Sequence, residues 1–149
     1  MIITYSQADG TVEELSTDDL TAREAADIEA AMGGAQWQRI EALLQLQDPT
    51  ALRATVWIFR RRAQPDLAFA DFDVPGWRRR LRARITRAEI EDALTNLMRQ
   101  ALSTRAEDTQ IDRVTPHLRT LAQDPADVDA ALDGLGKGHL VHRRQDSAD

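Results

Sequence analysis

Cysteine is absent from this chain of 149 residues. Its absence excludes a disulfide framework, a thiolate metal site and a cysteine nucleophile. Aromatic residues make up only 5% of the sequence, and no apolar run approaches the roughly 18 residues that cross a bilayer. Residues 1–10 lack the basic and apolar regions of a secretory signal peptide. These absences predict a cytoplasmic protein with no membrane partner.

The short motifs of common enzyme classes are missing as well. The chain has no phosphate loop of the required spacing, no dinucleotide fingerprint and no nucleophile elbow. His139 and His142 are three residues apart, but the charged, glycine-rich tail around them offers no committed acidic partner. Adjacent acids such as Glu91 and Asp92 fit a solvated helix face better than a general acid–base pair. We therefore expect no catalytic residue, no metal site, no cofactor and no enzymatic activity.

Acidic and basic residues are segregated along the chain, and basic residues are scarce at its start. The formal net charge is −6, yet residues 1–50 hold ten acids and two arginines, whereas residues 51–100 hold eleven arginines and six acids. The densest basic segment has six arginines between Arg78 and Arg87. Three interpretations stay open: charge pairing within the fold or with solvent, an acidic protein partner, or nucleic acid. Only Trp77 interleaves there as an aromatic residue, which makes nucleic acid the weakest of the three.

Turn and capping signals divide the first half into a hairpin and three helices. An Asp-Gly pair at 9–10 is a hairpin signal, because glycine accepts a positive φ. Thr21 and Glu24 have the spacing of a capping box. An Asp-Pro pair at 48–49 places an N-cap before proline at the first helical position. The expected elements are strands near 2–6 and 11–15 and helices over 21–32, 35–47 and 48–63.

The third of these helices changes abruptly from apolar to basic. Leu52, Val56 and Phe59 recur at helical spacing, so we expect the helix to be broadly buried and central. The arginines at 60–62 fall in its last turn, where cations complement the exposed carbonyl groups. A core helix with a basic end explains this stretch without nucleic acid. Leu52→Ala and Phe59→Ala are each expected to destabilise such a fold by about 2–5 kcal/mol.

The second half is predicted to be helical. Trp77, Leu81 and Ile85 are four residues apart and would share one helix face, with arginines around the rest. The helical periodicity continues to about residue 103, and the pattern leaves open whether 77–103 is one helix or two with a kink near residue 85. Further helices are expected near 112–123 and after an Asp-Pro pair at 124–125.

Together these patterns predict a mainly α fold, a small helical domain with a short N-terminal β-hairpin and a long Arg-rich helix in the second half. The expected organisation is a hairpin plus helical region over 1–74, a helical region over 75–133 packed on it, and a mobile tail over 134–149. The side chains expected to be mostly buried are Trp37, Val56, Phe59, Leu94 and Leu97.

Four segments of the first half share a further pattern. They are DLT-x-x-E-A at Asp19–Ala25, an apolar-Trp-apolar run followed by arginines at Val56–Arg62, then Pro65, then a short acidic-hydrophobic helix at Phe69–Phe72. In this order they resemble the tail assembly chaperone-like proteins of long-tailed phages and prophages of actinobacteria. The resemblance covers about residues 1–75.

The resemblance implies a small, acidic, non-catalytic helical protein that binds the long tape-measure protein while the tail tube polymerises around it, in the host cell cytoplasm. The alternative is a helical DNA- or RNA-binding regulator that uses the Arg78–Arg87 segment, and self-association also stays open. In the chaperone hypothesis, the arginines lie at the rim of an apolar stripe. The residues expected to bind the partner are Trp77, Arg78, Arg79, Leu81, Arg82 and Arg84.

Overall fold

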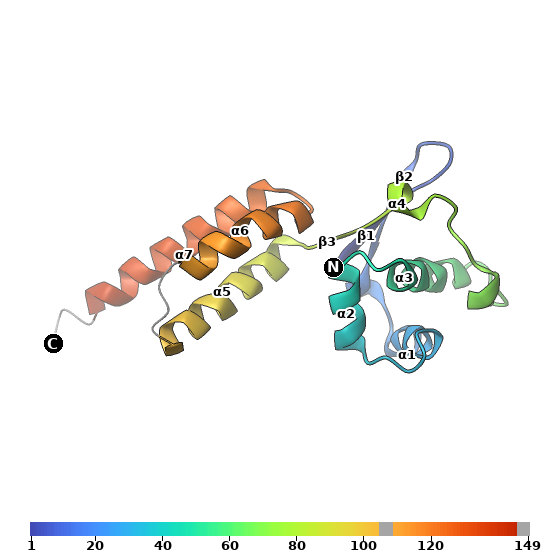
Figure 1. Cartoon of the computed structure of the whole chain (residues 1–149), viewed down its shortest axis with the longest axis horizontal. Helices are drawn as coiled ribbons and strands as arrows, with labels where there is room; N and C mark the ends of the chain where they lie inside the picture. The colour runs from blue at the N-terminus through green and yellow to red at the C-terminus, as the bar shows by residue number, and fades with distance from the viewer. Residues whose placement is uncertain (105–108, 146–149) are drawn as a thin grey trace. The chain divides into compact units, whose positions relative to one another are not determined.

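The computed structural model describes residues 1–104 and 109–145 (Figure 1). The chain forms two compact units, Met1–Arg84 and Ile85–Asp149, and each is described by itself. The division falls after Arg84, whereas the sequence suggested one after residue 74. No helix in the described residues is long and apolar enough to cross a membrane.

Unit 1 contains a three-stranded antiparallel sheet with the strand order β2-β1-β3. The α-helices α1, α2 and α3 follow the hairpin, and α3 packs against β1 and β3 as well as against α1 and α2. The elements in chain order are β1 (Ile2–Ser6), β2 (Val12–Ser16), η1 (Thr17–Asp19), α1 (Ala22–Ala31), α2 (Trp37–Gln45), α3 (Pro49–Arg61), η2 (Phe69–Asp71), α4 (Trp77–Arg80) and β3 (Leu81–Arg84).

The local signals of the first half correctly predicted the hairpin and the starts of two helices. Gly10 turns the hairpin with a φ of 88°, and the Asp9 carboxylate accepts the N–H of Thr11 at 2.9 Å. Thr21 and Glu24 form both halves of the capping box of α1. The Asp48 carboxylate caps α3 by accepting two backbone N–H groups of its first turn. The hairpin and the starts of α1 and α3 are therefore confirmed.

Helix α3 is the centre of the unit 1 core, as its apolar face predicted. Its buried residues lie around most of its circumference: Ala51, Leu52, Ala54, Thr55, Val56, Trp57 and Ile58. Ile3 and Leu81 of the sheet are fully buried as well. Among the side chains expected in the core, Val56 and, in unit 2, Leu94 are fully buried. Trp37, Phe59 and Leu97 are half-buried.

The expectation of a mainly α fold with a long Arg-rich helix is wrong. The Arg-rich segment forms one helical turn, α4, and then strand β3, which pairs with β1 through Ile2–Arg84 and Ile3–Ala83. The protein therefore has a mixed α/β fold. Leu81 and Ala83 are buried while Arg82 is exposed, which is the two-residue period of a strand. Pairing with β1 satisfies the backbone of this segment, and it overrides the four-residue spacing that suggested a helix.

The described residues of unit 2 form three helices, α5 (Arg87–Thr104), α6 (Thr109–Leu121) and α7 (Ala126–Gln145). The Thr86–Glu89 capping box at the start of α5 is present, because the Glu89 carboxylate accepts the Thr86 N–H at 2.8 Å. Ile85 forms a parallel bridge to Ala122. Residues 134–145, expected to belong to a mobile tail, continue helix α7, and residues 146–149 lie outside the described residues.

Candidate functional site

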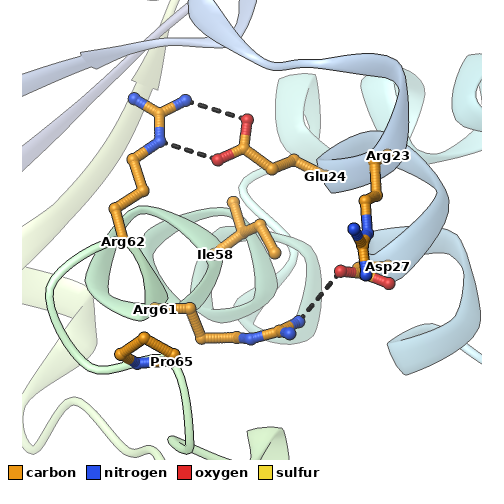
Figure 2. Close-up of a pocket in the computed structure, with 7 residues that line it drawn as sticks. All are labelled: Arg23, Glu24, Asp27, Ile58, Arg61, Arg62 and Pro65. Atoms are coloured by element: carbon orange, nitrogen blue, oxygen red, sulfur yellow. Dashed lines mark hydrogen bonds and ion pairs between the residues drawn. The ribbon is translucent and has the colours of Figure 1, made fainter.

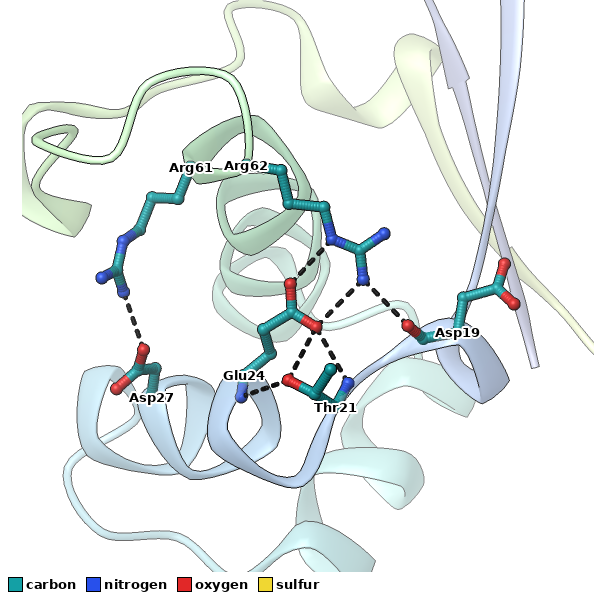
Figure 3. A network of polar contacts seen from close by, with 6 residues as sticks. All are labelled: Asp19, Thr21, Glu24, Asp27, Arg61 and Arg62. Carbon is teal, nitrogen blue, oxygen red and sulfur yellow. Dashed lines mark hydrogen bonds and ion pairs between the residues drawn. The ribbon is translucent and has the colours of Figure 1, made fainter.

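The segments that carry the phage-protein resemblance meet in unit 1 around the end of α3. Figure 3 shows Asp19, Thr21, Glu24 and Asp27 on one side and the two arginines Arg61 and Arg62 of the α3 end on the other. The Arg62 guanidinium donates to both carboxylate oxygens of Glu24, at 2.7 and 3.0 Å, and to the backbone oxygen of Asp19 at 2.8 Å. Residues that are distant in sequence are thus joined by one side chain.

Glu24 is held in its ionised form at this junction. Its pKa lies at about 2, well below its ordinary value of 4.5, mainly because Arg62 donates hydrogen bonds to the carboxylate. Backbone and hydroxyl hydrogen bonds from Thr21 lower the pKa further, whereas partial burial opposes the shift. The same pairing raises the pKa of Arg62.

The three arginines at the end of α3 each have a carboxylate partner within unit 1. Arg60 pairs with Glu13 of β2, Arg61 pairs with Asp27 of α1 at 3.0 Å, and Arg62 pairs with Glu24. The basic end of α3 therefore pairs with three of the ten acids in residues 1–50. The sequence predicted contacts of these arginines only with the carbonyl groups at the helix end, and their pairing with carboxylates is a finding of the structure.

A shallow groove of about 190 Å³ lies between α1 and the end of α3. Figure 2 shows Ile58 between the Arg62–Glu24 and Arg61–Asp27 pairs. Arg23 and Pro65 complete its lining together with these residues. Arginine binds both carboxylates of this groove. The two ion pairs therefore connect α1 to the end of α3.

The last segment of the resemblance is fastened to the outer side of α3. The Trp57 indole N–H donates to the backbone oxygen of Leu67 at 2.9 Å, and the Trp57 and Phe69 ring centroids are 5.3 Å apart. Arg53 donates to the backbone oxygen of Phe72 at 3.1 Å and lies 4.1 Å from the centroid of the Phe69 ring. Arg53 and Trp57 thus hold η2 against the central helix.

The six residues predicted to bind a partner do not share one helix face. Both Leu81 and Arg84 belong to β3, where Leu81 is fully buried and Arg84 is half-buried. Arg82 is exposed and donates to the backbone oxygen of Leu81 at 2.7 Å. Trp77, Arg78 and Arg79 remain together in α4, where Arg78 lies 5.6 Å from the centroid of the Trp77 ring. The apolar helix stripe expected for Trp77, Leu81 and Ile85 therefore does not form. What remains of the predicted site is a smaller surface around Trp77.

That surface borders a second groove in unit 1, of about 220 Å³, which we call the Trp77 groove. Gly76, at a φ of 70°, begins the turn that places Trp77 beside the start of α3. Val74 is only 2% exposed and supplies an apolar floor. The sequence missed most of this groove, because its lining comes from two segments that are separated by about 20 residues, 49–53 and 73–77. The lining residues are Pro49, Thr50, Arg53, Asp73, Val74 and Trp77.

Arg80, which the sequence did not single out, has a structural role. Its guanidinium donates to the Ser6 backbone oxygen at 2.8 Å and to the Tyr5 hydroxyl at 2.9 Å. It also lies 5.1 Å from the Tyr5 ring centroid. Arg80 thus anchors α4 to β1, while the neighbouring Arg78 and Arg79 stay exposed.

Unit 2 has a hollow of its own, of about 230 Å³, between α5 and α7. Arg87 and Glu91 form an i,i+4 ion pair of 2.8 Å at its edge. Among the described residues, no group of three or more acids and histidines could hold a metal ion. The side chains of His139 and His142 lie outside the described residues.

Comparisons with protein-family models, curated proteins and solved structures found no match to this chain. The residues themselves therefore carry the functional argument. The Trp77 groove has an indole ring and an apolar floor, and the exposed Arg78 and Arg79 follow Trp77 in α4. Aromatic residues and arginine are enriched in protein interfaces.

Proposed function

We propose that this protein is a non-catalytic tail assembly chaperone of a long-tailed phage or prophage, and that it binds the tape-measure protein in the host cell cytoplasm. The supporting observation is the double role of Arg53. It fastens the Phe69–Phe72 segment, which belongs to the resemblance, and it also lines the Trp77 groove. The segment that suggests the family thus adjoins the surface that suits a protein partner.

The parts of this surface have different roles in the proposed binding. Trp77 is the apolar anchor, beside the floor that Val74 supplies, since a half-buried indole gains contact area when a partner covers it. Arg78 and Arg79 lie exposed beside the groove, where charge mainly changes the association rate. Asp73 and Arg53 give the groove polar groups of both signs that fix the orientation of a bound helix.

Coexpression with a fragment of the tape-measure protein tests the proposal. The fragment is taken from the long, helix-rich reading frame expected downstream of this gene. The wild-type chain should keep this fragment soluble. Trp77→Ala should raise the dissociation constant at least about tenfold, which corresponds to about 1.4 kcal/mol. Trp37→Ala is the matched control, because Trp37 is also half-buried but lies on α2, where its indole donates to Glu41 at 2.9 Å.

Charge reversal tests the contribution of the exposed arginines to binding separately from that of the apolar anchor. Arg78→Glu with Arg79→Glu should slow association and reduce its dependence on salt, with an unchanged circular dichroism spectrum. Arg39→Glu, at an exposed position on α2, is the control for net charge. If the wild-type chain leaves the fragment insoluble, yet binds duplex DNA with a log–log salt slope of about −4 or steeper, the chaperone proposal is wrong. The alternative, a regulator that uses Arg78–Arg87, then takes its place.

A further inference from the structure

The three tryptophans of unit 1 differ in the partners of their indole N–H groups. Trp37 donates to the Glu41 carboxylate at 2.9 Å. Trp57 donates to the backbone oxygen of Leu67 at 2.9 Å. Within the part of the chain that the structure describes, the Trp77 N–H has no hydrogen-bond partner. Because an indole N–H usually finds a partner when its ring is covered, the half-buried Trp77 offers a free donor to a bound molecule.

Two cations follow Trp77 in α4. Arg78 and Arg79 are exposed, and neither forms an ion pair with a carboxylate of residues 1–104 or 109–145. The Arg78 guanidinium lies 5.6 Å from the Trp77 ring centroid, so one cation and the free indole donor belong to the same surface. The three arginines at the end of α3, by contrast, are all bound to carboxylates. Arg78 and Arg79 are therefore available to an acidic ligand.

The lining of the Trp77 groove contains charges of both signs. Arg53 uses one N–H for the backbone oxygen of Phe72 at 3.1 Å, and a guanidinium carries five N–H donors. The acid of the lining is Asp73, whose carboxylate accepts the Val74 N–H at 2.8 Å. Counted together with the two exposed arginines of α4, three arginines face one aspartate, which leaves a formal charge of +2.

The size of the Trp77 groove fits one side chain of a protein. The groove measures about 220 Å³, less than the roughly 300–1,000 Å³ of sites that enclose a small molecule. Val74 closes its floor with an apolar side chain that is 2% exposed. An apolar side chain of a partner can therefore enter the groove, and carboxylates next to it would meet the donors of Trp77 and Arg78.

We propose that the Trp77 groove receives an acidic segment of the protein partner, with one apolar side chain in the groove and carboxylates on both sides of it. One carboxylate accepts the Trp77 indole N–H, and the others pair with Arg78 and Arg79. Hydrogen bonds to an ionised acceptor are stronger than those to a neutral one, so the site selects glutamate or aspartate over their amides. The proposal rests on the proposed function, since it takes the same groove and adds the chemistry of the bound segment.

Nucleic acid suits this surface less well. Duplex DNA carries one negative charge for about every 1.7 Å of its axis, and a protein binds it through a patch or stripe of cations. In the basic segment, Arg80 is already bound to the Ser6 backbone oxygen and the Tyr5 hydroxyl. The exposed carboxylate of Asp73 would also repel a phosphate. A short acidic peptide segment needs only two or three cations, which matches what the surface offers.

Titration of the full chain with synthetic peptides tests the proposal. The probe is a fluorescein-labelled twelve-residue peptide with a central leucine and glutamates on both sides of it. Three control peptides replace the glutamates by glutamine, the glutamates by lysine, or the leucine by alanine. Fluorescence anisotropy should show saturable binding of the probe and at least tenfold weaker binding of each control. Absence of saturable binding, or equal affinity for the glutamine peptide, would overturn the proposal.

Charge exchange shows where the carboxylates bind. Arg78→Glu with Arg79→Glu should weaken binding of the probe at least tenfold and strengthen binding of the lysine peptide. Arg23→Glu with Arg39→Glu, at exposed positions on α1 and α2, is the control for net charge and should change both affinities by less than about twofold. Circular dichroism checks that both double variants fold. Equal effects of the two would overturn the proposal, because the probe would then respond only to net charge.

Trp77→Phe keeps an aromatic ring and removes the free N–H. The affinity of this variant for the glutamate probe should fall at least fivefold, and its affinity for the glutamine peptide should fall less, because the ionised acceptor gains more from the donor. Equal losses for the two peptides would overturn the assigned hydrogen bond.

The tape-measure fragment separates this proposal from the proposed function. A fragment that wild type and Arg78→Glu with Arg79→Glu keep soluble equally well would overturn the acidic segment and leave the chaperone proposal standing. A fragment that stays insoluble would overturn the chaperone proposal, while glutamate-dependent binding of the probe would still support the acidic segment. Duplex DNA that binds at least tenfold more tightly than the probe, or a dimer in sedimentation that Trp77→Ala dissociates, would overturn the acidic segment, because another occupant would then hold the groove.

Discussion

Arg62 joins three parts of unit 1 with a single guanidinium group. It donates to both oxygens of Glu24 on α1 and to the backbone oxygen of Asp19, and it lies 4.4 Å from the Phe59 ring centroid. Arginine suits such a position because its planar fork can serve several acceptors at once. Lysine at this position would keep the charge but lose the paired contacts.

Glu24→Gln tests the strength of this junction at the scale of one residue. Glutamine can keep the capping box of α1, so the variant mainly removes the charge that Arg62 binds. The Arg62 side chain is 43% exposed, and solvent screening limits the expected loss of unfolding free energy to about 1 kcal/mol at pH 7. Chemical denaturation measures this loss, and Glu91→Gln, in the exposed Arg87–Glu91 pair, should cost less than Glu24→Gln.

The pH dependence of the same variant follows from the pKa of Glu24. A carboxylate whose pKa is depressed to about 2 in the folded state stabilises the fold fully above its ordinary value of 4.5. Its contribution is lost as pH falls through the folded-state pKa. The difference in unfolding free energy between wild type and Glu24→Gln should therefore shrink between about pH 4.5 and pH 2. A difference that is constant over this range would contradict the assigned pairing.

At the scale of elements, short-range signals and long-range pairing account for different parts of the fold. The Asp-Gly turn, the Thr21–Glu24 capping box and the Asp-Pro start of α3 act within a few residues, so the sequence predicted them. Strand β3 depends on pairing with β1 across most of unit 1, which no local window contains. The alternation of Leu81, Arg82, Ala83 and Arg84 was the available signal.

The candidate site likewise has one part that the sequence predicted and another that depends on folding. Trp77, Arg78 and Arg79 are consecutive, and the sequence placed them together on a partner-binding surface. The remaining lining of the Trp77 groove comes from the start of α3 and from residues 73–74. Those segments meet only through folding, and Leu81 was assigned to the surface because a helix was assumed in place of a strand.

Substitutions along α3 test its central position. Leu52 is fully buried, so Leu52→Ala should lower the free energy of unfolding by about 2–5 kcal/mol through lost burial and a residual cavity. Phe59 is half-buried, so Phe59→Ala should cost less than Leu52→Ala, whereas the sequence suggested the same range of about 2–5 kcal/mol for each. Urea denaturation measures both. A larger loss for Phe59→Ala than for Leu52→Ala would contradict the core described here.

At the scale of the whole molecule, the sheet and the α3 core lie within residues 1–84. We expect a fragment of residues 1–84 to fold with a single cooperative thermal transition. A fragment of residues 1–76 is the matched control: it lacks β3, the buried Leu81 and the Arg80 bonds to β1. Circular dichroism should show a lower melting temperature or no transition for the shorter fragment. Equal stability of the two fragments would mean that β3 contributes little.

The pairing of Ile3 with Ala83 also has a consequence for synthesis of the chain. The first strand leaves the ribosome early, but its central position in the sheet is completed only when the last strand of unit 1 emerges. Closing so long a loop carries an entropic cost that no local contact offsets. During translation, the hairpin and the first three helices therefore form an incomplete unit until β3 emerges. In that interval one edge of β1 has no paired strand and could pair with another strand.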